Sequence, residues 1–452
     1  MVLAMSEQGA RVGAGRGIRP AGSLLRMVNP IRDYDWGSAE TLARMQRRPP
    51  TGGPEAELWM GAHSAAPSGV IDGEGAVHRL DELVTAMPHE VLGPQVGAAF
   101  GARLPFLLKI LAIARPLSLQ VHPDRDRARE GFEGEVEVLG EHRYTDPYPK
   151  PEMLYALERV EALCGFRPAA DASRLLALLD GPRLATIAEP LHHVARGGDE
   201  TAALEEAFRL LVTWPDDDRA DLAADAADET QRLLGTAARV GAPELSHADR
   251  RAVEWVGRLA EQHPKDALVI APLLLDLVIL EPGETLFVPA GAPHAYLHGT
   301  GVEIMGSSDN VLRAGLTHKA IAVEELLHVV DGRSRPHRDL PELSLGSHEV
   351  AWRPPVPEFQ LTRLRLPDGR SVVADGGLTG PQIVLCTSGT VSVRRASVEH
   401  VLRPGESLFA VADAAPLVVS GPGEVFRAAA GHGIGDAVTS AGSRADAGTP
   451  PG

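Results

Sequence analysis

The feature that most constrains the fold of this chain is an internal repeat. The segment PGETLFVPAGAPH at 282–294 is echoed by PGESLFAVADAAP at 404–416, at a constant offset of 122 residues. Both copies read Pro-Gly-Glu, then a hydroxyl residue, then Leu-Phe, and a Pro-Gly turn of this kind commonly precedes a β-strand. We therefore expect two copies of one β-architecture in this chain. Pro416 stands in the second copy where His294 stands in the first, so the second copy cannot hold a metal ion in the same way.

The hydrophobic pattern separates strand-rich from helix-rich parts of the chain. Short apolar runs interrupted by Gly, Pro and Asp predict many short strands from 27 to about 160 and again from 350 to 430. Between 165 and 265 the apolar residues recur at helical spacing instead. Ser246 and Asp249 predict a capping box at the start of one of these helices. One more helix is predicted over 321–331.

From these patterns we expect a mainly β protein with an α-helical insertion and two copies of one β-architecture, of which only the first binds metal. The predicted segments are a flexible tail over 1–26, a metal-binding β unit formed by 27–164 and 266–320, a helical insertion over 165–265, a second β unit over 321–435 and a disordered tail over 436–452.

Composition excludes several classes of protein. The chain has 452 residues with 44 basic and 61 acidic side chains, and its net charge of −17 disfavours nucleic-acid binding. Only two cysteines occur, Cys164 and Cys386, which excludes a disulfide framework and a thiolate zinc cage. The longest apolar stretch, at 267–280, is too short to span a bilayer. We expect a cytoplasmic monomer with no nucleic-acid or membrane partner.

Four residues form a candidate metal site. The spacing G-x5-P-x-G-x2-H over 283–294 resembles the second motif of the cupin family of small jelly rolls, in which the histidine is a metal ligand. Gln120 and His122 share one face of a predicted strand, and Glu152 adds a carboxylate. With His294 they offer two nitrogen and two oxygen ligands, which zinc accepts in sites left open for substrate. The alternative is a pair of ordinary core histidines with satisfied hydrogen bonds.

Six blocks in the same order resemble type I mannose-6-phosphate isomerase, a family of the cupin superfamily. This resemblance implies that both β units are cupin-type jelly rolls and that only the first binds metal. The helical insertion also falls where that family places it. The blocks are NPIRDYDWGS (29–38), ELWMGAHSAAPS (57–68), LPFLLKILAIARPLSLQVHPD (104–124), KPEMLYAL (150–157), FVPAGAPHAYL (287–297) and SSDNVLRAGLTHK (307–319).

The resemblance implies an isomerase that interconverts D-mannose 6-phosphate and D-fructose 6-phosphate, a step towards GDP-mannose and mannose-containing polymers. It implies one zinc ion per chain, bound by Gln120, His122, Glu152 and His294. It also implies a pocket lined or bordered by Trp36, Glu57, Lys109, Ser118, Lys150, Tyr296, Glu303, Asp309, Arg313 and Lys319. The chain departs from the family at Pro149, where other members often carry a histidine that can titrate.

The implied chemistry is the transfer of a proton between C1 and C2 through an enediol. We expect Arg313 to act on the substrate with support from Lys150, and Asp309 to be either an acid–base partner or a turn residue. The chain has only four lysines, and Lys109, Lys150 and Lys319 all lie inside the matching blocks. Because arginine is used almost everywhere else, these lysines point to a role for a compact ammonium group.

Two other functions fit parts of the pattern. A non-enzymatic, metal-bearing bicupin that senses a sugar would share the β units and the ligands. An iron-dependent cupin oxygenase would also share the fold, but a glutamine ligand argues against its usual histidine-rich site.

Overall fold

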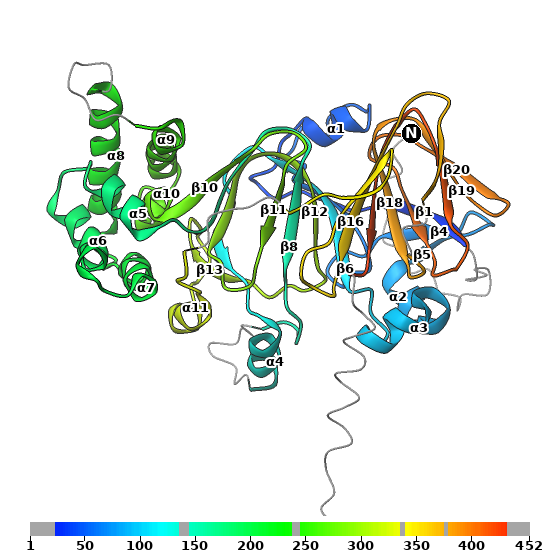
Figure 1. Cartoon of the computed structure of the whole chain (residues 1–452), viewed down its shortest axis with the longest axis horizontal. Coiled ribbons are helices and arrows are strands. Elements are labelled where there is room, and N and C mark those ends of the chain that lie inside the picture. Colours follow the sequence, from blue (N-terminus) through cyan, green and yellow to red (C-terminus); the bar gives the residue numbers. More distant parts are fainter. Residues whose placement is uncertain (1–22, 135–143, 237–244, 335–339, 375–377, 432–452) are drawn as a thin grey trace, which may run out of the picture.

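The computed structural model describes residues 23–134, 144–236, 245–334, 340–374 and 378–431. The predicted tail over 436–452 and all but the last four residues of the tail over 1–26 lie outside these ranges. The described chain is elongated, with a helical end, a first β unit and a second β unit following one another along its long axis (Figure 1). The prediction of a mainly β protein with helices is confirmed.

The first β unit is organised around one long strand, β12 (His294–Gly306). The C-terminal half of β12 pairs with β6 (Phe106–Ile113) and β8 (Glu152–Ala156), and its N-terminal half pairs with β7 (Leu119–Val121) and β9 (Val160–Phe166). The other strands of this sheet are β2 (Ile31–Arg32), β3 (Glu57–Met60), β10 (Leu275–Leu280), β11 (Thr285–Val288) and β13 (Leu312–Gly315). Because β12 spans both halves, side chains along this one strand reach both ends of the unit's interior.

The second β unit consists of a nine-stranded and a four-stranded sheet. The larger sheet has the order β14-β15-β16-β23-β18-β21-β1-β4-β5, with strands β14 (Leu343–Gly346), β15 (Glu349–Trp352), β16 (Gln360–Leu366), β18 (Gln382–Gly389), β21 (Ser407–Ala410), β23 (Gly423–Ala429), β1 (Leu24–Val28), β4 (Gly69–Ile71) and β5 (Val77–Arg79). The smaller sheet contains β17 (Ser371–Ala374), β22 (Leu417–Ser420), β19 (Val391–Arg395) and β20 (Val398–Leu402). Buried aliphatic residues from both sheets form one cluster.

The N-terminal part of the chain departs from the predicted segments. The expected metal-binding unit began at 27, but β1, β4 and β5 belong to the large sheet of the second unit, where β1 pairs with β21. The many short strands predicted from 27 to about 160 are present, but this stretch also contains helices that the pattern did not predict: α1 (Thr41–Met45), α2 (Leu80–Ala86), α3 (Pro88–Phe100) and α4 (Arg125–Gly134). Short alternating runs indicate that strands exist but carry no information on their partners, which tertiary packing selects.

The helical end contains α5 (Ala169–Leu176), α6 (Pro182–His192), α7 (Glu200–Val212), α8 (Arg219–Thr236), α9 (His247–Gln262) and α10 (Ala271–Leu274). Half of the predicted capping box is confirmed, because the Ser246 side chain accepts a hydrogen bond from the backbone N–H of Asp249. The Asp249 carboxylate, however, pairs with Arg174 at 2.9 Å. The helix predicted over 321–331 is present as α11 (Val323–Val329). No described helix has the length and apolarity that a membrane span requires.

The sequence repeat is also a repeat in structure. Gly283 and Gly405 both adopt a positive φ, of 109° and 82°, which glycine tolerates. In the first copy Gly283 donates its N–H to Ala156 O, and in the second Gly405 donates to Cys386 O, both at 2.9 Å. The following strands, β11 and β21, pair with β8 and β18 respectively. The two motifs therefore form the same turn against equivalent strands.

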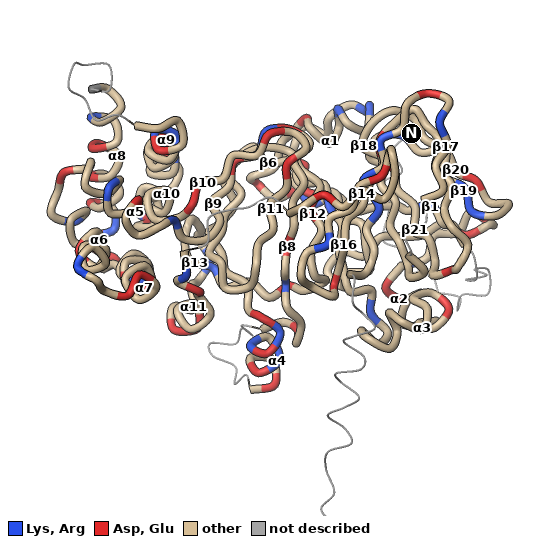
Figure 2. Tube along the Cα trace, viewed as in Figure 1, with Lys and Arg blue, Asp and Glu red and all other residues tan. Residues whose placement is uncertain are grey.

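A large apolar layer joins the two β units. It combines Leu108 and Ile304 of the first unit with Ile383 and Phe426 of the second, together with residues of α2 and α3. Charged residues concentrate on the helices and turns, whereas most of the strand trace is uncharged (Figure 2). The charged side chains inside the first β unit are therefore exceptions that call for a functional explanation.

Candidate metal centre and active site

The two predicted histidine ligands are held in one tautomer. His122 lies directly after β7, and its Nδ1 lies 2.9 Å from Asn310 O; His294 begins β12, and its Nδ1 lies 3.0 Å from Ala292 O. Because a carbonyl oxygen can only accept, each Nδ1 carries the proton and each Nε2 presents a lone pair. This arrangement prepares both rings for a metal bound at Nε2.

Glu152 brings a carboxylate to the same point. It starts β8, and its two oxygens lie 3.1 Å from His122 Nε2 and 3.4 Å from His294 Nε2. The three ligand atoms lie within 4.8 Å of one another, and all three side chains are buried. Both Nε2 atoms and Glu152 Oε2 have no hydrogen-bond partner among the described residues. Buried polar atoms are rarely left unpaired, so these three converging atoms fit a metal ion.

The electrostatics of this cluster keep it ready for a cation. Burial, with the nearby Lys150 ammonium, lowers the pKa of His122 to about 3, so its imidazole is neutral at pH 7. Burial alone would raise the pKa of Glu152, but the charge of the Lys150 ammonium holds it well below its ordinary value. The centre therefore offers the neutral imidazole of His122 and the carboxylate of Glu152 in the protonation states that zinc binds.

Gln120 and Arg313 lie beside this centre. On β7, Gln120 stands opposite His294 on one side and opposite Arg313 of β13 on the other. The Arg313 side chain is half-buried, and its guanidinium makes no hydrogen bond or ion pair with the described residues. Burial lowers its pKa below the ordinary arginine value. A free, partly desolvated guanidinium next to the metal ligands is available to an anionic substrate.

Lys150 and Lys109 neutralise the buried glutamates. The Lys150 ammonium lies 3.2 Å from Glu152, and the Lys109 ammonium lies 3.0 Å from Glu303 and 3.5 Å from Glu57. The two lysines and three glutamates leave one net negative charge, which a divalent zinc ion would turn into one positive charge. Burial raises the pKa of Glu303 and of the Tyr296 phenol above their ordinary values.

The remaining predicted residues lie nearer the surface or the periphery. Trp36 is half-buried and stacks on Tyr34 with ring centroids 5.9 Å apart. Ser118 precedes β7 and is half-buried, whereas Lys319 is exposed. Asp309 is partly exposed, and its backbone N–H donates to the Asp146 carboxylate at 3.0 Å. Of the fourteen predicted site residues, the structure brings His122, Glu152 and His294 together, with Lys150 beside Glu152 and with Lys109 paired to Glu57 and Glu303.

Sequence reasoning missed two residues at this site. His63 is buried, and its Nε2 lies 3.4 Å from the Asp309 carboxylate. Burial lowers the pKa of His63 despite the neighbouring Asp309, so it too is neutral at pH 7. Asn310 is buried, and its carbonyl orients His122 while its side chain binds Thr145 and Tyr148. Both residues lie inside quoted motif blocks, but a backbone carbonyl contact leaves no mark in a sequence.

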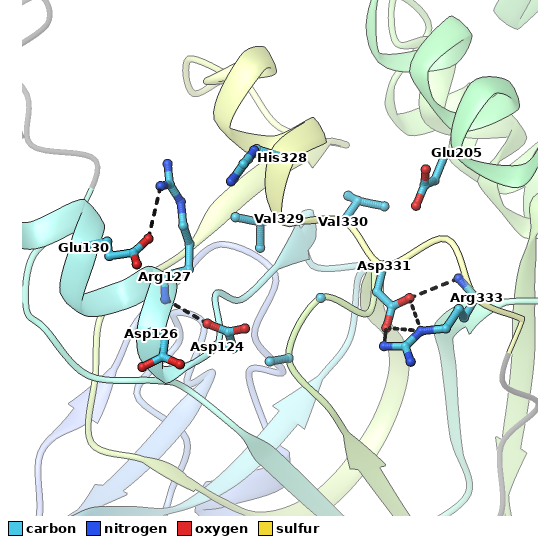
Figure 3. Close-up of a pocket in the computed structure, with 12 residues that line it drawn as sticks. Asp124, Asp126, Arg127, Glu130, Glu205, His328, Val329, Val330, Asp331 and Arg333 are labelled. Atoms are coloured by element: carbon cyan, nitrogen blue, oxygen red, sulfur yellow. Dashed lines mark hydrogen bonds and ion pairs between the residues drawn. The ribbon is translucent and has the colours of Figure 1, made fainter. Parts of the chain in front are cut away.

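A pocket of about 460 Å³ lies between α4, the turn at 290–291 and the segment that follows α11 (Figure 3). It contains none of the predicted site residues. Figure 3 shows its cations turned towards its own acids: Arg333 pairs with Asp331 at 2.6 Å, and Arg127 lies 4.0 Å from Glu130. This pocket is therefore distinct from the metal centre.

Comparison with known proteins identifies relatives of this chain. Residues 24–169 match the family model "Phosphomannose isomerase type I, catalytic domain". The chain is 32% identical to mannose-6-phosphate isomerase of Escherichia coli K12 over 89% of this chain and 99% of that protein, and 30% identical to mannose-6-phosphate isomerase 1 of Arabidopsis thaliana over 86% and 90%. A crystal structure of a phosphomannose isomerase variant from Salmonella typhimurium superposes with a TM-score of 0.78 at 30% identity, covering 90% of this chain and 99% of that one. A zinc-bound mannose 6-phosphate isomerase structure superposes with a TM-score of 0.77 at 31% identity, covering 90% and 100%.

The fold and the buried histidine–carboxylate centre define a zinc-dependent isomerase. Its relatives from Escherichia coli K12 and Arabidopsis thaliana are both named as mannose-6-phosphate isomerases, and the match covers 99% and 90% of their lengths. The chain belongs to the type I mannose-6-phosphate isomerase family.

Proposed function

We propose that this chain interconverts mannose 6-phosphate and fructose 6-phosphate at the centre formed by His122, Glu152 and His294, with Gln120 as a fourth ligand. The observation that carries the proposal is the set of three unpaired, buried ligand atoms near the ammonium groups of Lys150 and Lys109. A bound zinc ion would polarise the sugar oxygens between which the carbonyl moves.

Arg313 and Lys150 act on the substrate in this proposal. The Arg313 fork is free to donate two parallel hydrogen bonds to a sugar oxygen or to the phosphate. Lys150 places a compact ammonium 3.2 Å from the ligand Glu152, where it can donate to the oxygen on which negative charge develops in the enediol. Lys109, Glu57 and Glu303 hold each other in place behind the substrate.

His63 and Asp309 are the proton-holding pair at the rim of the site. Position 149, where the family often carries a histidine, is Pro149 in this chain, and proline cannot titrate. A neutral His63 imidazole, 3.4 Å from the Asp309 carboxylate, can take up and return a proton at neutral pH. This role favours Asp309 as an acid–base partner rather than as a turn residue.

The finer features of the fold belong to the same proposal. We infer that both β units are cupin-type jelly rolls and that only the first binds metal, as the shared turn and the exchange of His294 for Pro416 support. The expectation of a monomer stays a prediction, which sedimentation equilibrium would test.

The test is a coupled assay on purified protein, with fructose 6-phosphate formation read from mannose 6-phosphate and with metal content measured on the same sample. We expect about one zinc ion per chain and isomerase activity that a chelator abolishes and zinc restores. A zinc-loaded protein with no isomerase activity would favour the sugar-sensing alternative. Iron in place of zinc would favour the oxygenase.

A further inference from the structure

The segment that carries Lys150 is stiff. Prolines occupy positions 147, 149 and 151, so Tyr148 and Lys150 each stand between two prolines. Each proline fixes its own φ, and a residue that precedes a proline is confined to extended conformations. The segment therefore moves as one piece, and a shift of Tyr148 would carry the backbone of Lys150 with it.

The carbonyl group of Tyr148 attaches this segment to the loop after β12. Its oxygen accepts hydrogen bonds from Ser308 Oγ at 3.1 Å and from Asn310 Nδ2 at 2.9 Å. The same loop contains Asp309, to which the proposed function assigns a proton-holding role. Lys150 and Asp309 therefore lie on two segments that are joined through Tyr148.

Arg103, which lies between α3 and β6, contacts both segments from a third part of the chain. Its Nη1 donates a hydrogen bond to Ser307 O at 2.9 Å. Its guanidinium carbon lies over the Tyr148 ring, 3.5 Å from the centroid, which is a close cation–π contact. Its Nε is buried and has no hydrogen-bond partner among the described residues. One hydrogen bond and the contact with the ring thus hold this guanidinium, which joins the two segments a second time.

We propose that Arg103 is a positioning residue for the isomerase reaction. By holding the Tyr148 ring beside Ser307 O, it fixes the place of the Lys150 ammonium. The inference rests on the function proposed above, in which Lys150 acts on the substrate. That ammonium lies 3.2 Å from Glu152, so a displacement of about 1 Å would take it beyond hydrogen-bond distance. A misplacement of that size can cost about 100-fold in rate.

The test compares kcat, KM and zinc content of Arg103→Met with those of the natural protein. Methionine keeps an unbranched aliphatic chain but loses the planar cation. We expect kcat to fall by about 10–100-fold, with KM changed by less than about twofold and zinc content unchanged. The matched control is Arg258→Met, which removes a guanidinium that lies 5.1 Å from the ring centroid of Trp255 in the helical end. This control should leave all three quantities unchanged, and an unchanged kcat in Arg103→Met would overturn the proposal.

Double substitution separates positioning from a general loss of structure. In a Lys150→Met background, Arg103→Met should lower kcat no further, because its effect passes through Lys150. A loss as large as that in the natural background would refute the positioning role. Tyr148→Phe keeps the face of the ring and should leave kcat unchanged, whereas Tyr148→Leu should reproduce the loss. Tyr148→Leu also replaces Arg103→Met in these comparisons if the arginine variant fails to fold.

A structural measurement keeps this inference separate from the proposed function. Crystal structures of the zinc-loaded natural protein and of zinc-loaded Arg103→Met locate the Lys150 ammonium directly. We expect the ammonium to move by about 1 Å or more in the variant. An unmoved ammonium would overturn the positioning role even in an active isomerase. A displaced ammonium would support that role even if the natural protein proved to catalyse another reaction.

Discussion

Glu303 and Lys109 lie directly opposite each other on β12 and β6, and their side chains form a 3.0 Å ion pair inside the first β unit. Lys109 also lies 3.5 Å from Glu57, and all three side chains are buried. Burial alone would lower the pKa of Lys109, but the charges of Glu303 and Glu57 raise it above the ordinary lysine value. One ammonium group thus holds two carboxylates in the active-site interior.

Replacing Lys109 by methionine should therefore destabilise the fold. The substitution leaves Glu57 and Glu303 buried without a counter-charge, and the free energy of unfolding should fall by about 3–5 kcal/mol. Urea unfolding at pH 7 measures the change, with Lys265→Met, at an exposed lysine, as the control. Because the pKa is raised in the folded state, this contribution should be present below about pH 10 and lost as the pH rises through the raised pKa. Equal stability of the two variants would contradict the assignment.

Zinc binding should depend on the first β unit alone. His294→Ala removes a ligand and should lose both metal and activity, because the other ligands cannot complete the site. Pro416→His restores the histidine of the motif to the second copy, but position 416 is exposed, whereas His294 is buried, so the variant should bind no additional metal. Metal analysis by mass spectrometry checks both variants. Two zinc ions per chain in Pro416→His would show that the second copy is a metal site lacking only its histidine.

Lys150→Arg separates a compact ammonium from a simple positive charge. If Lys150 donates to one developing oxyanion, the bulkier planar guanidinium should lower kcat by roughly 10²–10⁴-fold. Zinc content should stay unchanged, although Glu152 lies only two residues away. Steady-state kinetics together with metal analysis tests this. Turnover near that of the natural protein would remove Lys150 from the mechanism and leave Arg313 or the His63–Asp309 pair.

Arg313→Lys tests contact between the planar guanidinium and the substrate. The substitution keeps the charge but loses two parallel donors, so kcat should fall and KM should rise together. Arg353→Lys, at a partly buried arginine of the second β unit, is the matched control and should leave both constants unchanged. A normal KM with a reduced kcat would restrict Arg313 to the transition state and assign phosphate binding to another cation.

The metal-free protein should lose stability as the pH falls below about 6.5. The unfolded chain takes up a proton on His122 near its ordinary pKa, but the folded chain does not do so until about pH 3. Each such proton costs up to about 1.4 kcal/mol per pH unit, and the loss should grow from pH 6.5 towards 4.5. Urea unfolding of chelated protein at several pH values, compared with His122→Asn, measures this slope. The variant should show a shallower dependence, and identical slopes would refute the assignment.

The metal centre could be predicted from the sequence because its parts obey local rules. Gln120 and His122 share a strand face by the two-residue period, and His294 follows a turn whose glycine and proline spacing is itself a signal. The same kind of local pattern predicted the Ser246 cap. These features depend on neighbours in the chain, and neighbours are visible in a sequence.

Features that depend on distant partners were missed. The pairing of β1 with β21 joins Leu24 to Ala410, and no periodicity within five residues encodes such a partner. The His63–Asp309 contact likewise joins a turn after β3 to a loop after β12. Helix α3 was missed because glycine and proline interrupt its pattern, at Gly93 and Pro94. In each case tertiary packing decided what the local sequence left open.

The pairing of β1 with β21 also bears on how the protein is made. The ribosome releases residues 24–28 at the start of synthesis, but their partner at 407–410 emerges only when the chain is nearly complete. Until then β1, β4 and β5 lack the strand of the large sheet with which β1 pairs. A fragment that stops after the last metal ligand would keep every zinc-binding residue, yet it would expose the apolar face that Ile383 and Phe426 cover. The enzyme therefore cannot be shortened to its chemically active half.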